Sequence, residues 1–363
     1  MMVQQHYTLS FITPAFLGNA EQQGQWRTPP FKALLRQWWR VAAAKSHDYN
    51  HERLREAEGR LFGNAWIEND FRKSEVRLRL DAWDMGRLSS NAWPGGSIEN
   101  VVTTHDGRSR VRADVYMGYG PVMPPSRQEN RPHITIRNAI DPKDSRNLYL
   151  GFENNLQDDI FETLQLIQWF GSLGSRSRNG WGSIMLESAQ ENTPSLSILP
   201  KFDSLVLNRI CRPWRQCLGE SWPHALGTES DNPLVWITEE KPDWRTVMGC
   251  LANIKIEVRH IAKAFQGPIG IGGIHFLGYP AGGKWELKKF GKEARLASQI
   301  RFKVLKINNG FIGLIFHFPC KFPDELKIKL DDKQAKWINE NEHLVWEKIH
   351  GNLRKNNRLK PLF

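Results

Sequence analysis

Residues 158–187 read DDIFETLQLIQWFGSLGSRSRNGWGSIMLE and join three kinds of local structure. Ile160, Leu164 and Ile167 recur at helical spacing and predict a helix that ends just before the first glycine. Residues 171–183 hold four glycines, which is typical of a loop. The short apolar run that follows predicts a strand. A helix, a glycine-rich loop and a strand therefore follow one another directly.

The elements before this stretch give the order of a known domain type. Thr28-Pro29-Pro30 predicts the start of a helix, with Thr28 as N-cap. Its apolar residues recur at helical spacing and include Trp38 and Trp39, which we expect in the core. Strands are predicted at 3–12, 75–80, 98–104, 109–117, 132–140 and 146–152. The order strand, helix, strands, helix, strand is that of a ferredoxin-like domain with a hairpin insertion.

The chain has 363 residues, which suggests two domains at roughly 150 residues each. Residues 189–200 are polar and contain proline, so they predict a linker between an N-terminal domain, 1–190, and a C-terminal domain, 191–363. In the second domain we predict a helix near 243–265, a strand pair at 298–307 and 311–318, and a helix at 331–349. The last 16 residues carry five basic groups and no acid, which predicts a mobile or docking tail.

Composition excludes several classes of protein. Hydrophobic residues make up 40% and charged residues 25% of the chain, with mean hydropathy −0.52, a soluble globular balance. No apolar run approaches the roughly 20 residues of a membrane helix, and the N-terminus lacks the pattern of a secretory signal. The four cysteines form no CxxC pair. We therefore expect a cytoplasmic protein without disulfides, metal or cofactor.

The net charge of +11 indicates a polyanionic partner. Residues 1–190 have a net charge of only +2, but 19 of their 23 basic residues are arginines, whereas residues 191–363 have a net charge of +9. Arginine binds phosphate oxygens with two parallel hydrogen bonds and stacks on flat rings. The N-terminal half is thus suited to close contact with a nucleic acid, although each basic run could equally be a solvated surface.

The glycine-rich loop is the first candidate site. Glycine allows the backbone to approach a phosphate closely, and the two arginines of the loop add charge. No Lys-Ser or Lys-Thr pair follows, so the loop is not that of a nucleotide triphosphate site. The alternative is a flexible surface turn. We predict RNA contacts from Gly174, Arg176, Arg178, Asn179, Gly180 and Gly182.

Two further groups of arginines are candidates. Arg36 and Arg40 share one row of the predicted helix that begins at Thr28. Arg108, Arg110 and Arg112 alternate along one predicted hairpin strand, so they project from one face of it. We predict that both groups contact RNA.

Four strings together resemble one protein family. Residues 12–18 (ITPAFLG) and 35–40 (LRQWWR) resemble the N-terminal signature of the first Cmr-type subunits of type III-B CRISPR effector complexes. Residues 173–183 (LGSRSRNGWGS) resemble the glycine-rich loop of the RAMP superfamily, which includes those subunits. Residues 295–302 (RLASQIRF) resemble the late RxAS strand of that superfamily, with Gln299 where proline is usual.

The resemblance implies an α+β fold of two ferredoxin-like (RRM-like) domains, each an antiparallel sheet with helices on one face. It implies a non-catalytic RNA-binding subunit in an antiviral ribonucleoprotein, with CRISPR guide RNA, complementary target RNA and other RAMP subunits as partners. RNA cleavage in that family belongs to other subunits.

Two other functions fit part of the sequence. A RAMP-type endoribonuclease that processes CRISPR precursor RNA would need a general base, for which His47 and His105 are nominal candidates. A general single-strand RNA-binding protein outside CRISPR systems would also explain the charge and the glycine-rich loop.

Overall fold

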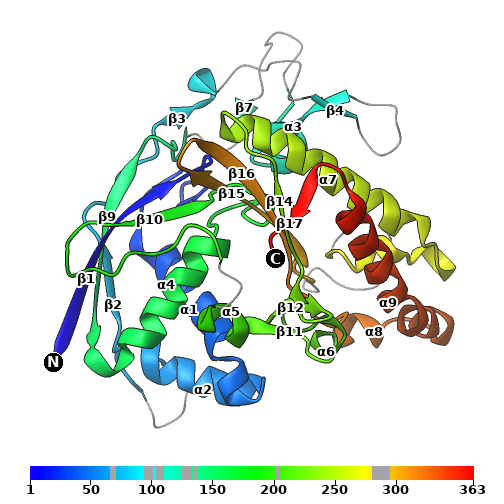
Figure 1. Cartoon of the computed structure of the whole chain (residues 1–363), viewed down its shortest axis with the longest axis horizontal. Coiled ribbons are helices and arrows are strands. Elements are labelled where there is room, and N and C mark those ends of the chain that lie inside the picture. Colours follow the sequence, from blue (N-terminus) through cyan, green and yellow to red (C-terminus); the bar gives the residue numbers. More distant parts are fainter. Residues whose placement is uncertain are drawn as a thin grey trace. The chain divides into compact units, whose positions relative to one another are not determined.

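The computed structural model describes residues 1–65, 71–93, 101–103, 110–124, 133–134, 138–200, 204–279 and 295–363. The chain divides into two compact units, coloured along the sequence in Figure 1. The first comprises Met1–Ser97, Met117–Ile210 and Lys303–Phe311, and the second comprises Ile98–Tyr116, Cys211–Phe302 and Ile312–Phe363.

The first unit is built on a four-stranded antiparallel sheet. Its strands are β1 (Met2–Phe11), β2 (Arg77–Leu80), β9 (Ser145–Glu153) and β10 (Ile184–Ser188). They lie in the order β10-β1-β9-β2, and β1 is antiparallel to both of its neighbours. Alternate residues of β1 are buried because successive side chains of a strand point to opposite faces. The order of the strands is the ferredoxin-like order expected from the sequence.

Helices cover one face of this sheet. α1 (Thr28–Ala43) and α4 (Gln157–Phe170) pack against each other on it (Figure 1). Trp38 and Trp39 are buried in α1, as the helical spacing predicts. The apolar face of α4 is likewise buried from Ile160 onward. The opposite face of the sheet carries the polar side chains of β1, β2 and β9.

The helix termini agree with the sequence only in part. The sequence also predicts a second helix that starts at Asn50 and ends with Gly63 at its C-cap, and α2 (His51–Phe62) confirms it: the Asn50 side chain accepts a hydrogen bond from the Arg53 N–H, and Gly63 is the C-cap. Thr28, in contrast, is not the N-cap of α1: Arg27 takes that position. The Thr28 hydroxyl accepts a hydrogen bond from the Leu80 N–H instead, because β2 passes beside it.

The insertion between β2 and β9 consists of short paired strands and one helix. These elements are β3 (Leu88–Ser89), β4 (Val101–Thr103), β5 (Arg110–Arg112), α3 (Ala113–Gly118), β6 (Val122–Met123), β7 (His133–Ile134) and β8 (Asn138–Ala139). β3 pairs with β8, β4 with β5 and β6 with β7, all antiparallel. The strand predicted over 109–117 is wrong beyond Arg112, where α3 begins.

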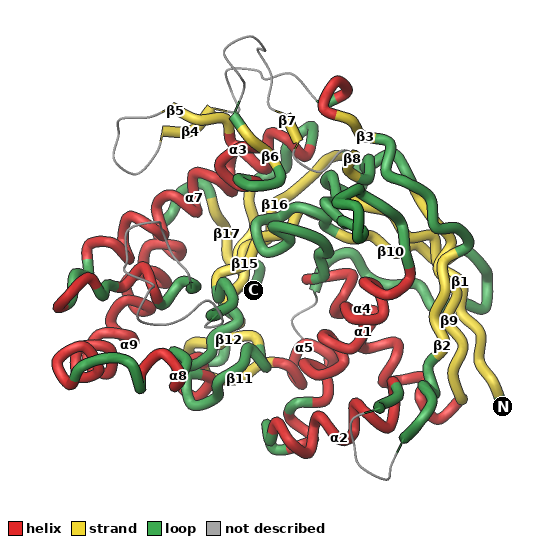
Figure 2. Tube along the Cα trace, turned by 180° about the vertical axis from the view of Figure 1, so that it is seen from behind, coloured by secondary structure: helices red, strands yellow, loops and turns green. Residues whose placement is uncertain are grey.

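The second unit repeats the ferredoxin-like order. Its sheet contains β14 (Val235–Thr238), β15 (Ile300–Ile307), β16 (Gly310–His317) and β17 (Leu359–Pro361), and its long helices are α7 (Trp244–Ala264) and α9 (Asp332–Lys355). The strand order is β15-β16-β14-β17, with β14 antiparallel to β16 and β17. α7 and α9 pack side by side (Figure 2). The tip of the β15–β16 hairpin, Lys303–Phe311, belongs to the first unit. The α+β fold with antiparallel sheets is therefore confirmed.

The remaining elements are α5 (Leu205–Ile210) of the first unit and, in the second, β11 (Cys211–Pro213), α6 (Trp214–Cys217), β12 (Leu226–Glu229), β13 (Asn232–Pro233) and α8 (Asp324–Lys327). The prediction that the basic C-terminal residues form a mobile tail is wrong. Residues 348–355 extend α9, and β17 completes the sheet. Arg354 pairs with Glu229 and Arg358 with Glu257, so acidic side chains neutralise two of its charges.

Candidate nucleic-acid interface

The glycine-rich loop, residues 171–183, packs tightly in the first unit. It folds back on itself through a hydrogen bond from the Leu173 N–H to the Gly182 carbonyl, 2.9 Å long. Two more bonds fasten it to the segment after β1: the Ser175 N–H donates to Phe16 at 3.0 Å, and the Gly182 N–H donates to Pro14 at 3.0 Å. The alternative of a flexible surface turn therefore does not describe this loop.

Two glycines of the loop are required by the packing. Gly174 has φ +99°, and a Cβ there would lie 2.8 Å from the Phe16 carbonyl oxygen. Gly182 has φ +60°, and a Cβ there would lie 1.9 Å from the Leu173 carbonyl oxygen. Gly180 also has a positive φ, +87°. Only glycine adopts these conformations without strain. The contact of these glycines with RNA stays a prediction.

Arg176 is exposed in an unusual backbone conformation. Its φ is +60°, a region that residues other than glycine rarely occupy. Its Nε donates a hydrogen bond of 2.8 Å to the Tyr119 carbonyl. Its Nη donors have no protein partner within the part of the chain that the structure describes. Arg178 is also exposed, so the loop presents two guanidinium groups at the surface.

Asn179 is not a surface donor. The side chain is 9% exposed, and its Nδ2 donates a hydrogen bond of 2.8 Å to the Met117 carbonyl. Its backbone N–H donates to the Arg176 carbonyl at 2.9 Å. Both donors are thus used inside the protein. Asn179 positions the loop and the arginine beside it.

Arg36 and Arg40 meet a partner that sequence reasoning missed. Both guanidinium groups bind the carboxylate of Glu58, which lies on α2 and is 1% exposed on its side chain. Arg40 Nη2 donates to Glu58 Oε1 at 2.9 Å. Burial, and then the charge of Arg36, lower the pKa of Lys32 one turn earlier. Arg36 and Arg40 therefore join α1 to α2 through Glu58. Their side chains nevertheless remain 30% and 42% exposed, respectively.

The three hairpin arginines have different surroundings. Arg108 lies outside the described residues. Arg110 is exposed at the end of β5, and Arg112 is bound by Asp114, with Nη2 at 2.6 Å from Oδ2. The two described arginines belong to the second unit, whereas the glycine-rich loop belongs to the first.

Comparison with known proteins identifies the segment that contains the loop. A model of the RAMP superfamily matches residues 8–185, from β1 to the start of β10. The matched residues make up just under half of the chain. We call them the RAMP segment.

The chain is also similar to three named proteins. It is 22% identical to the CRISPR system Cmr subunit Cmr1-2 of Pyrococcus furiosus over 197 residues, which are 52% of this chain and 98% of that protein. A crystal structure of Cmr1 from Pyrococcus furiosus in the apo form has TM-score 0.46 and 16% identity, with 92% of each chain covered. A chain in a cryo-EM structure of the type III-B Cmr-beta bound to cognate target RNA has TM-score 0.44 and 14% identity, with 93% of this chain and 100% of that chain covered.

Hydroxyl groups close the loop of the RAMP segment at its base. The Thr13 hydroxyl donates to the Gly180 carbonyl at 2.7 Å and accepts from the Ser183 N–H at 3.1 Å. The Ser183 hydroxyl donates to the same Gly180 carbonyl at 2.9 Å and accepts from the Val304 N–H at 3.0 Å. Thr13 belongs to the string ITPAFLG, so its contact with the loop explains why the two strings occur together.

Lys303 caps the helix that leads into the RAMP segment's loop. Its side chain is fully buried, and Nζ donates to the carbonyls of Ile167 at 3.0 Å and Gln168 at 2.6 Å. These carbonyls lie in the last turn of α4, where helix carbonyls run out of intrahelical partners; that of Ile167 also accepts from the Gly171 N–H at 2.8 Å. Burial lowers the pKa of Lys303 well below its usual value. No local sequence signal announces this contact, because Lys303 lies more than a hundred residues after the helix.

Trp181 fills the underside of the loop. It is fully buried, and its ring packs with Phe16 at 5.2 Å and Trp93 at 5.6 Å between centroids. It therefore serves the core and is not a stacking platform for a base.

The described part of the chain offers neither a metal-binding cluster nor a membrane-spanning helix. Among the described residues, no group of three or more His, Cys, Asp or Glu side chains could hold a metal ion. In the same part of the chain, none of the helices is both long and apolar enough to cross a bilayer.

Proposed function

We propose that this chain is a non-catalytic, RNA-binding subunit of a type III-B CRISPR effector complex, where it contacts guide RNA or complementary target RNA beside other RAMP subunits. The RAMP segment and the similarity to a protein named as a Cmr subunit support the assignment to the complex. The net charge of +11 supports a polyanionic partner.

The proposal rests on the way in which the structure holds the Arg176 side chain at the surface. A left-handed backbone at a residue other than glycine costs about 1–3 kcal/mol and persists only where the surroundings enforce it. Here the Tyr119 carbonyl binds Nε, the packed loop fixes the backbone, and the Nη donors stay available. A guanidinium group fixed in this way loses little freedom when it binds a phosphate.

The proposed contact between Arg176 and a phosphate does not recognise the bases of the RNA. Arginine neutralises phosphates, whereas sequence in such a complex is read by pairing between guide and target. The glycine-rich loop therefore fixes the path of a ribose-phosphate strand.

A salt series of filter-binding measurements tests the proposal. Replacing Arg176 and Arg178 by Ala should weaken binding of single-stranded RNA and lower the slope of log affinity against log salt by about two. The matched control is R55A/R60A, which removes two exposed arginines of α2 from the same unit. Equal affinity of wild type and R176A/R178A would refute the assignment of the loop.

Membership of a complex needs a second experiment. We expect the tagged chain, purified from its native host, to carry CRISPR-derived RNA and other RAMP subunits, with the RNA identified by sequencing. A preparation free of RNA would argue against this part of the proposal.

The loop's composition favours binding over cleavage. Residues 171–183 contain no His, Lys or carboxylate, the usual general acids and bases. His47 ends the short 3-10 helix that follows α1, Lys45–His47, where its Nδ1 is 2.9 Å from the Ala43 carbonyl oxygen, and His105 lies outside the described residues. Discrete cleavage of a repeat-containing RNA by the purified chain would reverse this preference.

A further inference from the structure

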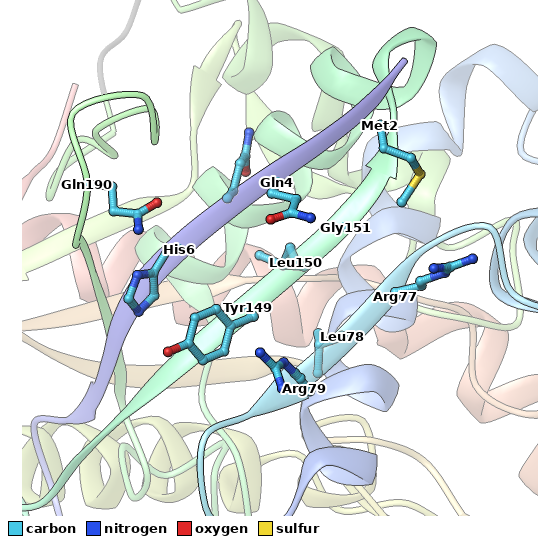
Figure 3. A pocket seen from close by; sticks show the side chains of 11 residues that line it. Met2, Gln4, His6, Arg77, Leu78, Arg79, Tyr149, Leu150, Gly151 and Gln190 are labelled. Carbon is cyan, nitrogen blue, oxygen red and sulfur yellow. The ribbon is translucent and has the colours of Figure 1, made fainter.

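The uncovered face of the first sheet contains a pocket away from the glycine-rich loop. Helices α1 and α4 cover the other face of this sheet (Figure 1). The pocket has a volume of about 370 Å³ and is lined by side chains of β1, β2 and β9 and by Gln190 (Figure 3). Its lining includes two arginines and no acidic residue.

One wall is a row of three stacked side chains. Strand register places His6 of β1 opposite Tyr149 of β9, and Tyr149 opposite Arg79 of β2. The rings of His6 and Tyr149 are stacked, with centroids 4.4 Å apart and planes 17° apart. The Arg79 guanidinium carbon lies 4.7 Å from the centroid of the Tyr149 ring. The three groups thus form a positively charged stack across the two central strands and the edge strand β2.

His6 has unused hydrogen-bonding capacity. Both of its ring nitrogens are shielded from solvent, and neither has a hydrogen-bond partner among the residues described. Shielded polar atoms without a partner are rare in folded proteins and call for an explanation. Because both nitrogens are shielded, His6 contributes to the pocket through its stacked ring.

The floor of the pocket is bare backbone. Gly151 lies in the next row, opposite Gln4 of β1 and Arg77 of β2. A Cβ at Gly151 would meet only the Met2 Cε at 3.6 Å and the Arg77 Cβ at 3.9 Å, so the space above it is open. Figure 3 shows the Gln4 amide, the Arg77 and Arg79 side chains and the Tyr149 ring around this floor.

We propose that this pocket binds one nucleotide of single-stranded RNA, with the base over Gly151 beside the Tyr149 stack and the phosphates at Arg77 and Arg79. The inference rests on the proposed function and adds a second contact, at which the strand is unpaired. Open antiparallel sheets bind single-stranded RNA through aromatic rings on their central strands. The volume lies near the lower end for ligand pockets, which suits one nucleotide and excludes a duplex.

The chemistry of the lining favours a base over a peptide. Rings and guanidinium planes accept any base by stacking, and the amides of Gln4 and Gln190 offer both donors and acceptors to a base edge. The pocket opens on the face of the sheet, whereas an added peptide strand would pair along the outer edge of β2, the edge strand that supplies Arg77 and Arg79.

Equilibrium binding of a fluorescein-labelled RNA of twelve uridines to the full chain tests the proposal. Tyr149→Leu keeps an apolar side chain but removes the ring that lies between His6 and Arg79, so one wall of the pocket is lost, and we expect affinity to fall at least about fivefold. Arg77→Ala should weaken binding and lower the salt slope by about one. The controls are Phe71→Leu, which removes an exposed ring elsewhere in the first unit, and Arg60→Ala, which removes an exposed charge on α2.

Crosslinking provides a measurement that does not depend on altered affinity. With one uridine replaced by 4-thiouridine, irradiation should attach the RNA to peptides of β1 or β9 in wild type, and less in Tyr149→Leu. Thermal melting shows whether each variant is folded.

The outcomes separate the two proposals. If Y149L and R77A bind like wild type while R176A/R178A does not, the pocket is overturned and the proposed function stands. If crosslinks fall only within residues 171–183, or if only a peptide binds the face, the pocket is likewise overturned. If wild type binds no RNA, both proposals fail.

Discussion

The Nζ atom of Lys303 lies 2.6 Å from the carbonyl oxygen of Gln168, at the last turn of α4. A residue of β15 that belongs to the first unit thereby caps the helix that leads into the glycine-rich loop. One residue later, the Val304 N–H binds the Ser183 hydroxyl at the other end of that loop, 3.0 Å away. The base of the loop is fastened at both ends by consecutive residues of β15, which explains how so many glycines remain ordered.

Lys303 makes stability depend on pH. Burial lowers its pKa in the folded state, so the unfolded chain binds more protons and the free energy of unfolding rises with pH up to the unfolded value near 10.4. Between pH 8 and 10, wild type should gain up to about 1.4 kcal/mol per pH unit relative to Lys303→Met in urea denaturation. Lys306→Met, at an exposed position of the same strand, is the control. A constant difference between wild type and Lys303→Met would contradict the prediction.

Gly182 cannot carry a side chain. A Cβ there would lie 1.9 Å from a backbone oxygen, and φ is positive, so Gly182→Ala should destabilise the chain by about 3 kcal/mol or more. Gly18→Ala is the matched control, because no atom lies within 4 Å of a Cβ at that position, and its effect should stay within about 0.5 kcal/mol. Thermal unfolding measures both. Equal melting temperatures for the two variants would mean that the loop is looser than described.

Glu58 joins α1 to α2 by charge. Removing the charge with Glu58→Gln leaves two guanidinium groups facing one amide, which should lower stability by about 1–3 kcal/mol. The range is below that of a fully buried pair because Arg36 and Arg40 are partly exposed. Glu56→Gln, on the exposed side of α2, should change little. Chemical denaturation of wild type, E58Q and E56Q measures these changes in stability. Equal stability of E58Q and wild type would show that Arg36 and Arg40 do not depend on the Glu58 carboxylate.

A histidine pair makes the second unit sensitive to mild acid. His350 Nε2 lies 2.9 Å from His317 Nδ1, and burial lowers the pKa of His350 to about 3 and that of His317 well below its usual value. The unfolded state therefore binds more protons below pH 6.5, and stability is lost as pH falls through that value. From pH 7 to 5.5 we expect a loss of about 2–3 kcal/mol. His51→Asn, at an exposed position, should not change this loss. A free energy of unfolding that stays level over this range would contradict the assignment.

Local patterns predicted most of the elements around the loop. The alternation of β1, the stripe of α1 with its two tryptophans and the Asn50 cap of α2 depend on neighbours within a few residues, so periodicity reveals them. The paired strands β15 and β16 follow from an Asn-Asn-Gly turn for the same reason. Thr13 and Gly182 also lie in two strings, residues 12–18 and 173–183, that resemble family signatures in sequence alone.

Other features depended on partners distant in the sequence. The basic C-terminal residues looked like a tail because their charge is a local property, whereas the strand β14, against which β17 pairs, lies more than a hundred residues earlier. Gln299 stands where the family pattern usually has proline. Its side chain donates a hydrogen bond to the Phe276 carbonyl and accepts one from the Cys320 N–H, two residues that lie far apart in the chain.

The sequence by itself therefore determined the ferredoxin-like order of the N-terminal half, the place of the glycine-rich loop and the excess of positive charge, because periodicity and composition are local. Only the tertiary structure decided what the charged groups do. It directed Arg36 and Arg40 to Glu58, buried Lys303 at the end of α4, and aligned His6, Tyr149 and Arg79 in one row. Strand register and helix packing set those distances, and no spacing along the chain encodes them.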